Sequence, residues 1–330
     1  MLLPSEEIKK IIVFRALQLG DWLCAVPAIR ALRHAYPDAE ITLCGLLWST
    51  LLVERFPVYF DRFIHFPGYP GLPEQAFDPR TFPGFLEEVQ GRQFDLALQL
   101  QGNGSVVNAM VELFGARYTA GYYFQGHYYP DNGLFMEYPN GGSEIERHLK
   151  LMNHLGIPSQ GNHLEFPITE KDQQEFAELD LDIQAGNYVC IHPGSRGSWR
   201  QWPTEYFAAL ADYSYESGYI PVITGTKDEL AITAAVVKQM KHSPVLAAGK
   251  TSLGAAALLI KNARALVSNC TGVSHMAAAF ETQSIVISMD GEPERWAPVN
   301  RNVHYVIDWL KTPDFELAEA QLVKLLKNAA

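Results

Sequence analysis

The sequence predicts an α/β protein built from two doubly wound domains. In both halves, short stretches rich in apolar and β-branched residues alternate with stretches of helical periodicity. This alternation is typical of a parallel sheet covered by helices on both faces. A chain of 330 residues is also long enough to form about two hydrophobic cores. Residues 158–187 are rich in the turn-forming residues Pro, Gly and Asn, and we expect the domain boundary there.

The first half contains recognisable strands and helices around an irregular middle. We expect strands at 11–14, 41–46 and 94–100, and helices at 23–35 and 144–155. Residues 66–84 are rich in Pro and Gly, which predicts an irregular excursion. Residues 118–129 are rich in aromatic side chains, and the last helix ends at Gly156 and Pro158.

The second half repeats the alternation more regularly. We expect strands at 188–191, 219–224, 244–247, 264–268 and 284–288, and helices at 204–217, 228–241, 252–261 and 273–280. Ligands of such sheets bind at the carboxyl ends of the strands, where the strand order switches. The loops that follow these strands are therefore the places where functional residues are expected.

Composition excludes several classes of protein. The net charge of −11 argues against general binding of nucleic acid. No apolar run approaches the roughly 20 residues that a membrane span requires. The start, MLLPSEEIKK, lacks the pattern of a secretory signal. The four cysteines, Cys24, Cys44, Cys190 and Cys270, are scattered, which favours reduced thiols in a cytoplasmic protein.

Residues 187–206 have the pattern of an anion site. A buried-looking strand leads into a Gly- and Ser-rich loop that carries Arg196 and Arg200, and a helix begins near Thr204. The backbone of such a loop can approach a phosphate, and guanidinium groups can meet it with paired donors. An ordinary loop with two solvated arginines is the alternative.

Three further strand ends carry candidate residues. Asp21 follows a glycine at a helix start, where it is either a helix cap or a general base. Glu229 is either a solvated acid of a first helical turn or an acceptor for ribose hydroxyls. Thr271 and Gly272 precede a helix of small residues, whose free N–H groups suit a diphosphate.

Motifs of other enzyme classes are absent. The sequence has no G-x-G-x-x-G fingerprint, no Walker G-x-x-x-x-G-K-[ST] and no Y-x-x-x-K pair, which argues against a nicotinamide-dependent epimerase. The histidines do not form a spaced set of metal ligands. We therefore predict neither a metal nor a cofactor.

Between about residue 11 and residue 300 the chain contains a series of motifs in a fixed order. They are LGDW, AVPAIRAL, FDLALQLQG, GARYTAGY, EIERHLKLMNHLG, IHPGSRGSWRQWP, VITGTKDE, SNCTGVSHMAAA and DGEPERWAP. Together they resemble glycosyltransferase family 9, the ADP-heptose:lipopolysaccharide heptosyltransferases and their relatives. The resemblance implies the GT-B architecture, with two Rossmann-like domains facing a central cleft. It places an acceptor-binding domain at 1–165 and a nucleotide-sugar-binding domain at 175–314. It also implies that a helix at 315–330 packs back on the first domain.

The resemblance assigns a role to individual residues. Asp21 matches the catalytic base of the family, and Arg15 stands where a basic residue often accompanies that base. Arg200 takes the position of the lysine that contacts the donor phosphates. The implied donor-binding set is Ser195, Arg196, Arg200, Thr226, Glu229, Cys270, Thr271, Gly272, Val273, Ser274 and His275. The implied acceptor-binding set is Gln101, Tyr122 and Tyr123. Cys270 is a departure, since the family commonly has aspartate there.

The implied reaction is an inverting, metal-independent transfer of a heptose-like sugar. The donor would be a nucleoside-diphosphate sugar such as ADP-heptose, and the acceptor a glycan or glycolipid such as lipopolysaccharide core. We expect the protein in the cytoplasm, with or without peripheral contact at the inner membrane. Two alternatives stay open: a catalytically silent relative that binds nucleotide sugars, kept open by Cys270, and another kind of sugar-nucleotide enzyme.

Overall fold

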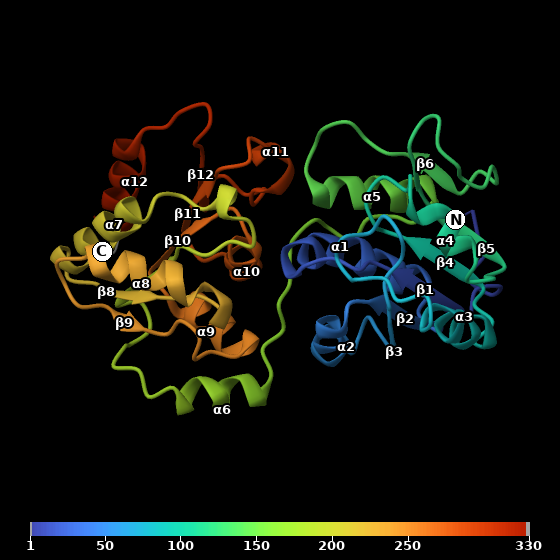
Figure 1. Ribbon diagram of the computed structural model, residues 1–330, viewed down its shortest axis with the longest axis horizontal. Coiled ribbons are helices and arrows are strands. Elements are labelled where there is room, and N and C mark those ends of the chain that lie inside the picture. Colours follow the sequence, from blue (N-terminus) through green and yellow to red (C-terminus); the bar gives the residue numbers. More distant parts are fainter. Residues whose placement is uncertain (1, 328–330) are drawn as a thin grey trace. The chain divides into compact units, whose positions relative to one another are not determined.

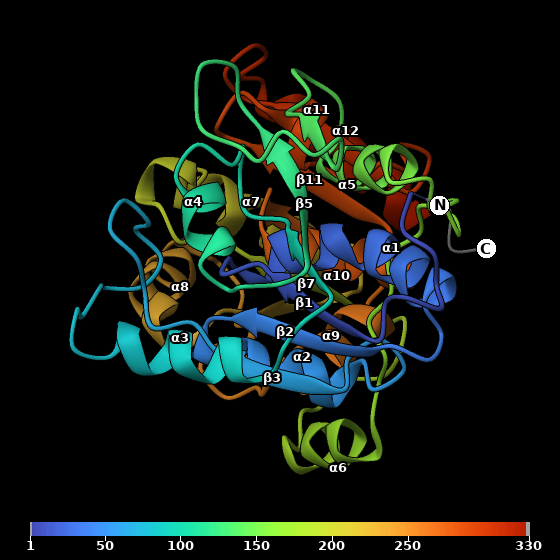
Figure 2. The ribbon, with the colours of Figure 1, turned by 90° about the vertical axis from the view of Figure 1, so that its right-hand side faces the viewer.

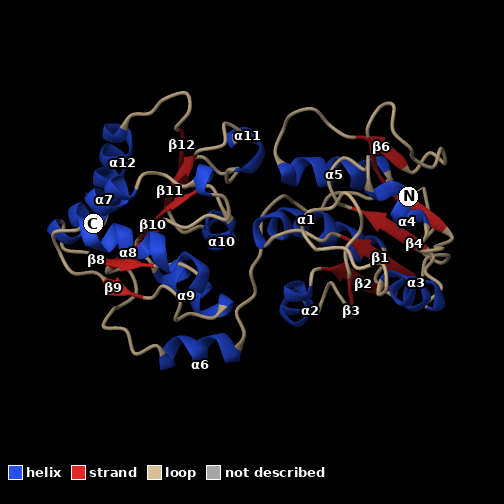
Figure 3. Cartoon of the chain, in the orientation of Figure 1, coloured by secondary structure: helices blue, strands red, loops and turns tan. Residues whose placement is uncertain are grey.

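The computed structural model describes residues 2–327 and divides the chain between Asn162 and His163 into two compact units. Each unit is one parallel six-stranded sheet with helices packed around it (Figures 1 and 3). The α/β class and the alternation of strands and helices predicted from the sequence are therefore confirmed. The division lies within the segment 158–187 that was expected to contain the boundary.

The sheet of the first unit has the strand order β3-β2-β1-β4-β5-β6. Its strands are β1 (Lys10–Phe14), β2 (Glu40–Gly45), β3 (Arg62–His65), β4 (Leu96–Gln99), β5 (Tyr118–Tyr123) and β6 (Phe135–Glu137). Figure 2 shows β1, β2 and β3 side by side. The chain moves outward from β1 in one direction and then returns to β4, so the switch point lies between β1 and β4.

Helices complete the first unit. They are α1 (Leu19–Ala35), α2 (Thr50–Arg55) after a 3₁₀ turn at Leu47–Ser49, α3 (Phe82–Gly91), α4 (Val107–Glu112) and α5 (Glu144–His154). Side chains of α3 and α4 pack on Ile12 and Phe14 of β1 in one buried apolar cluster. Helices α1 and α5 pack against each other, which brings the residues after β1 close to the start of α5.

The sheet of the second unit has the order β12-β11-β10-β7-β8-β9. Its strands are β7 (Tyr188–His192), β8 (Ile220–Ile223), β9 (Val245–Leu246), β10 (Ala265–Asn269), β11 (Ser284–Ser288) and β12 (His304–Asp308). Strands β7, β10 and β11 are buried along their whole length, as expected for central parallel strands. The switch point of this sheet lies between β7 and β10.

The helices of the second unit are α6 (Glu170–Glu178), α7 (Thr204–Glu216), α8 (Leu230–Gln239), α9 (Leu253–Asn262), α10 (Gly272–Phe280), α11 (Pro293–Trp296) and α12 (Phe315–Lys327), with 3₁₀ turns at Ser198–Arg200 and Lys227–Glu229. The described part of helix α12 contacts α7, β11 and β12 of the second unit. Ala318 and Leu322, which share one helical face, are fully buried there. The expectation that residues 315–330 also pack on the first domain stays a prediction. Residues 328–330 lie outside the described part of the chain.

Some elements were not predicted. Only one of the four residues of strand β3 (Arg62–His65) is buried, so its sequence lacks the run of apolar residues that indicates a strand. The aromatic stretch from residue 118 begins as β5, which is a strand. Helix α3 begins at Phe82, inside the segment expected to be irregular, because Pro83 occupies the first turn, where proline is tolerated. Strand β12 and the short helices α2 and α4 were also missed.

Candidate functional site

Asp21 lies in the first turn of α1, directly after the switch-point strand β1 of the first unit. Its Oδ2 accepts a hydrogen bond from the backbone N–H of Gln18 at 3.2 Å, so the carboxylate does cap the helix start. Burial raises the pKa of Asp21 above its ordinary value of 3.8; Arg15 opposes this shift and the carboxylate of Glu144 adds to it. A carboxyl with a raised pKa at a strand end has the properties of a general base.

Arg15, at the end of β1, is completely buried. Its Nε and Nη2 donate to the carbonyl oxygen of Asp21 at 3.1 and 2.9 Å, and its Nη1 donates to the carbonyl of Leu100 at the end of β4. The guanidinium thus joins the two strands at the switch point and holds the backbone of Asp21. The residues predicted as base and accompanying cation are in contact, through the main chain of Asp21.

A buried ionic cluster beside Arg15 was not predicted. Glu144, the first residue of α5, lies 3.6 Å from Arg15 Nη2, 3.1 Å from Arg147 Nη1 and 3.6 Å from His148 Nε2. All four residues are at most 6% exposed. A signal was present, because residues 144, 147 and 148 have the i, i+3, i+4 spacing that places side chains on one helical face.

The three predicted acceptor residues differ in accessibility. Gln101 is buried, and its Oε1 accepts a hydrogen bond from the backbone N–H of Ala16 at 2.8 Å. Tyr122 is 1% exposed, with its hydroxyl 3.0 Å from His148 Nδ1. The structure therefore gives no support for direct contact of either side chain with an acceptor. Tyr123 is half-buried and stacks on Tyr129, with ring centroids 4.0 Å apart.

The predicted anion loop of the second unit follows β7 and is fixed by a residue that was not predicted. Asn269, at the end of β10, donates through Nδ2 to the carbonyl of Pro193 at 2.8 Å and accepts through Oδ1 from the N–H of Trp202 at 2.9 Å. It therefore ties both ends of the loop to the neighbouring strand across the switch point. Within the loop, Ser195 is buried and Arg196 is exposed.

Arg200 lies at the end of this loop and forms an ion pair with Asp290. Its Nε donates to Asp290 Oδ2 at 3.0 Å, its Nη2 contacts the same oxygen, and its side chain is 31% exposed. Asp290, which follows β11, also accepts from the hydroxyl of Ser288 at 2.8 Å. Burial alone would raise the pKa of Asp290, but the hydrogen bonds from Arg200 and Ser288 outweigh it and lower that pKa. Asp290 thus stays ionised and orients the Arg200 guanidinium.

Glu229 reaches back toward the same loop. Its Oε2 accepts from the N–H and the hydroxyl of Thr226 at 2.7 and 3.0 Å. The same oxygen lies 3.8 Å from Nε2 of buried His192, whose Nδ1 lies 3.0 Å from Thr224 Oγ1. A Cβ on Gly194 would lie only 2.2 Å from the Glu229 carboxyl carbon, so this close approach requires glycine.

The start of α10 completes the group of strand ends. Thr271 precedes the helix, and Gly272 and Val273 begin it. Because these residues stand at the helix start, their N–H groups have no intrahelical partner. All three residues are half-buried. The Ser274 hydroxyl donates to the carbonyl of Thr271 at 2.7 Å, which caps this turn internally. Ser274 and His275 are buried.

Cys270 lies directly before this turn and packs on Val286 and Ala297. Burial raises the pKa of its thiol to about 12. A buried, protonated thiol is a poor nucleophile. The structure therefore agrees with Cys270 as a small apolar residue of the site rather than a reactive one.

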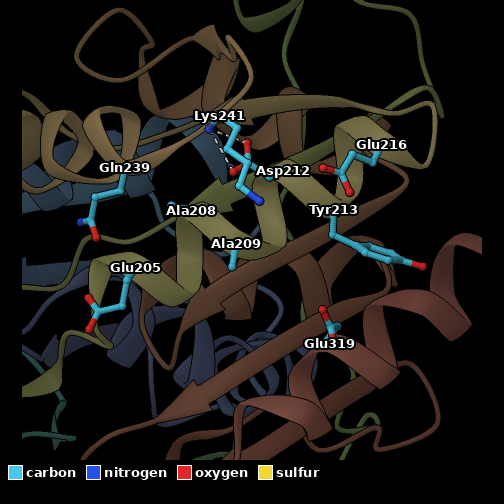
Figure 4. A pocket seen from close by; sticks show the side chains of 9 residues that line it. All are labelled: Glu205, Ala208, Ala209, Asp212, Tyr213, Glu216, Gln239, Lys241 and Glu319. Atoms are coloured by element: carbon cyan, nitrogen blue, oxygen red, sulfur yellow. Dashed lines mark hydrogen bonds between the residues drawn. The ribbon is translucent and has the colours of Figure 1, made fainter.

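A pocket of about 280 Å³ lies elsewhere in the second unit, on α7, α8 and α12. Its lining includes Glu205, Asp212 and Glu319 and none of the predicted site residues (Figure 4). Asp212 accepts hydrogen bonds there from the N–H groups of Lys241 and His242, so its carboxylate is committed to the backbone. Within residues 2–327, no cluster of three His, Cys, Asp or Glu could hold a metal, and no helix is long and apolar enough to cross a membrane.

Comparisons with known proteins identify the family and the fold. Residues 84–322 match the profile of glycosyltransferase family 9 (heptosyltransferase). The lipopolysaccharide heptosyltransferase 3 of Escherichia coli is 25% identical over 295 residues, covering 86% of this chain and 84% of that protein. The crystal structure of a family 9 glycosyltransferase from Veillonella parvula has a TM-score of 0.80 at 20% identity, covering 100% of this chain and 99% of the other.

A second solved structure, E. coli ADP-heptose lipopolysaccharide heptosyltransferase II, has a TM-score of 0.76 at 20% identity and covers 97% of this chain and 98% of the other. These likenesses confirm the predicted GT-B class of fold. The family match covers well over half of the chain. The chain belongs to glycosyltransferase family 9, and it is a glycosyltransferase.

Proposed function

We propose that this enzyme transfers a heptose-like sugar from a nucleoside-diphosphate donor, with inversion at the anomeric carbon, to a cell-surface glycan. The observation that carries the proposal is the meeting of four strand ends in the second unit. Asn269 fixes the loop after β7. Glu229, in the 3₁₀ turn after β8, lies against that loop, and Asp290, which follows β11, orients Arg200. A small-residue loop, an oriented guanidinium and a helix start together form a site for a diphosphate.

The proposed chemistry is an in-line displacement. Asp21 removes the proton of the acceptor hydroxyl as that oxygen attacks the anomeric carbon, and the bond to the nucleoside diphosphate breaks on the opposite face. A base with a raised pKa takes this proton more readily than an ordinary carboxylate. The charge that develops on the leaving diphosphate is stabilised by Arg200 and by the N–H groups of Gly272 and Val273.

The identity of donor and acceptor rests on similarity to named relatives. The E. coli proteins reported above are called lipopolysaccharide heptosyltransferases, and one is named for ADP-heptose. By analogy, we propose ADP-heptose as the donor and lipopolysaccharide core as the acceptor, reached by peripheral contact with the inner membrane. Glu229 is assigned to the ribose hydroxyls and Tyr123, stacked on Tyr129, to a sugar face of the acceptor.

The test is a thermal-shift series followed by a transfer assay. ADP-, GDP-, UDP- and dTDP-linked sugars are added separately, since a ligand present at 100 times its Kd stabilises the native state by about 2.7 kcal/mol. We expect a selective shift with ADP-heptose that is lost in Arg200→Ala. Arg80→Ala is the matched control, because Arg80 forms an exposed ion pair with Asp78. This variant should show the same thermal shift as the wild type.

The same series also tests the silent relative that Cys270 kept open in the sequence. Such a protein would show a donor-dependent shift without release of nucleoside diphosphate when acceptor is supplied, so turnover with any acceptor excludes it. A folded protein that no donor stabilises would contradict the proposed donor site.

A further inference from the structure

We propose that Glu144 is a positioning residue for sugar transfer: it anchors Arg15, which holds Asp21 at the switch point of the first sheet. This inference rests on the proposed function, in which Asp21 is the base. It concerns the buried ionic cluster described above, Arg15, Glu144, Arg147 and His148, of which the proposed chemistry uses no member. Tyr122 and Tyr138 pack beside this cluster.

The contacts form a continuous chain from α5 to Asp21. Glu144 Oε1 lies 3.6 Å from Arg15 Nη2, and the same guanidinium donates twice to the carbonyl of Asp21. Arg15 also donates to the carbonyl of Leu100, so one side chain links α5, β1, β4 and α1. Displacement of the Arg15 guanidinium would therefore release the turn that carries Asp21.

Glu144 also contacts two residues of its own helix, Arg147 and His148. Its Oε2 receives Arg147 Nη1 at 3.1 Å, and its Oε1 lies 3.6 Å from His148 Nε2. The hydroxyl of Tyr122 lies 3.0 Å from His148 Nδ1, and Arg147 Nη1 donates to the hydroxyl of Tyr138 at 3.1 Å. Tyr122 of β5 and Tyr138, which follows β6, thus fix the orientation of the His148 ring and the Arg147 guanidinium.

The burial of this cluster points to function rather than to stability. Glu144 and Arg15 are 3% and 0% exposed. Buried ion pairs lose so much hydration that apolar residues of the same volume are often as stable. A group of charges with specific contacts beside a carboxyl of shifted pKa is instead typical of an active site.

The charges around Asp21 give the proposal a distinctive readout. From β1 the charged neighbour is Arg15, and from α5 it is Glu144, which raises the pKa of Asp21. Arg147 and His148 face Glu144 from its own helix, and Tyr122 and Tyr138 face it from β5 and from the residues after β6. Burial raises the pKa of Tyr122 well above 10, so its phenol does not titrate in the working range.

These neighbours determine the direction in which each variant shifts the pKa of Asp21. Activity requires ionised Asp21, so the acidic limb of kcat/KM against pH reports its pKa. Glu144→Gln removes a negative charge, which favours ionised Asp21 and moves the limb to lower pH. Arg147→Gln leaves the negative charge of Glu144 less compensated and moves the limb to higher pH. Both variants loosen Arg15, so the plateau should fall roughly 10- to 100-fold.

The experiment measures pH–rate profiles of the full chain with ADP-heptose and a lipopolysaccharide core acceptor. Glu146→Gln is the matched control, since Glu146 is exposed two residues along the same helix and glutamine preserves its capping position. Its limb and plateau should match the wild type. Glu144→Asp keeps the charge and should keep the limb near its wild-type pH.

Three results would overturn the proposal. The first is that folded Glu144→Gln and Arg147→Gln show the acidic limb of kcat/KM at the same pH as the wild type. The second is equal limb shifts in the Glu146→Gln control. The third is loss of folding in both cluster variants, which would assign the cluster to stability. Asp21→Asn separates this from failure of the proposed function: if it retains full transfer, the assignment of the base is wrong whatever Glu144 does.

Discussion

At the scale of single residues, Arg200 is the cation to which the proposed function assigns the donor diphosphate. Two of its nitrogen atoms already contact one oxygen of Asp290, and its side chain is 31% exposed, so it is oriented but accessible. Hydrogen bonds to charged groups are worth about 1.5–3 kcal/mol. We therefore expect Arg200→Ala to weaken donor binding by roughly 10- to 150-fold, measured by calorimetric titration. An unchanged Kd would remove Arg200 from the donor site.

The thiol of Cys270 gives a second prediction at this scale. Because burial raises its pKa to about 12, little thiolate exists at pH 8. In the native state it should react with a thiol-specific reagent far more slowly than in denaturant, and donor turnover should survive the treatment. Rapid modification that tracks loss of activity would show that Cys270 is exposed and reactive in solution.

How far single residues can be predicted depends on the reach of their contacts. Asp21 and Arg200 follow strands within a local pattern, so their positions could be read from the sequence. Asn269 and Asp290 act on residues 67 to 90 positions away, and no local pattern indicates that. Tyr122 shows a related limit: an aromatic residue that suits sugar stacking suits a buried strand equally well, and here it is buried.

At the scale of elements, the loop after β7 depends on the absence of a side chain at Gly194. A Cβ there would meet the Glu229 carboxyl, which is held by Thr226. Gly194→Ala should therefore displace either the loop or Glu229, costing about 1–3 kcal/mol of stability and weakening donor binding. Gly84→Ala, where a Cβ meets nothing within 4 Å, is the control. Equal effects of the two substitutions on donor binding would contradict this account.

The pairing of β11 with β12 gives a prediction of pH dependence. His304 Nδ1 lies 2.8 Å from the hydroxyl of Ser284, and burial, aided by Arg301, lowers the pKa of His304 to about 4. Its unfolded value is 6.5, so between these values the unfolded state binds more protons. Stability should therefore fall as pH drops from about 6.5 to about 4, by about 3 kcal/mol from this group.

Denaturant unfolding of the wild type and His304→Asn at pH 7 and pH 5 measures this contribution. The variant should lose less stability between the two pH values. The same change at exposed His127 is the control and should leave the pH dependence as in the wild type. A wild-type dependence retained in His304→Asn would assign the acid sensitivity to other groups.

Whether a helix or strand could be predicted depended on how clear its sequence pattern is. Buried central strands such as β7 and β10 are continuous apolar runs, and they were predicted within a residue or two. The edge strand β3 and the short helices α2 and α4 have four to six residues, too few to show a period. The packing of α12 on α7 could not be foreseen, because an amphipathic helix does not indicate which apolar surface receives it.

At the scale of the whole molecule, each unit has its own sheet and its own switch point. The candidate base lies at the β1–β4 switch and the candidate donor site at the β7–β10 switch. Donor binding and proton removal are thus assigned to different units. Substitutions at Asp21 should leave the donor-induced thermal shift intact while abolishing turnover, and substitutions at Arg200 should reduce both.

The most direct test of the central claim is transfer itself. Wild-type protein and Asp21→Asn are incubated with ADP-heptose and a lipopolysaccharide core acceptor, and release of ADP, product mass and anomeric configuration are measured. We expect the wild type to release one ADP per heptose added, with the anomeric configuration inverted, and Asp21→Asn to be slower by about 10²- to 10⁴-fold while still binding donor. Retention of configuration, or undiminished transfer by Asp21→Asn, would contradict the account.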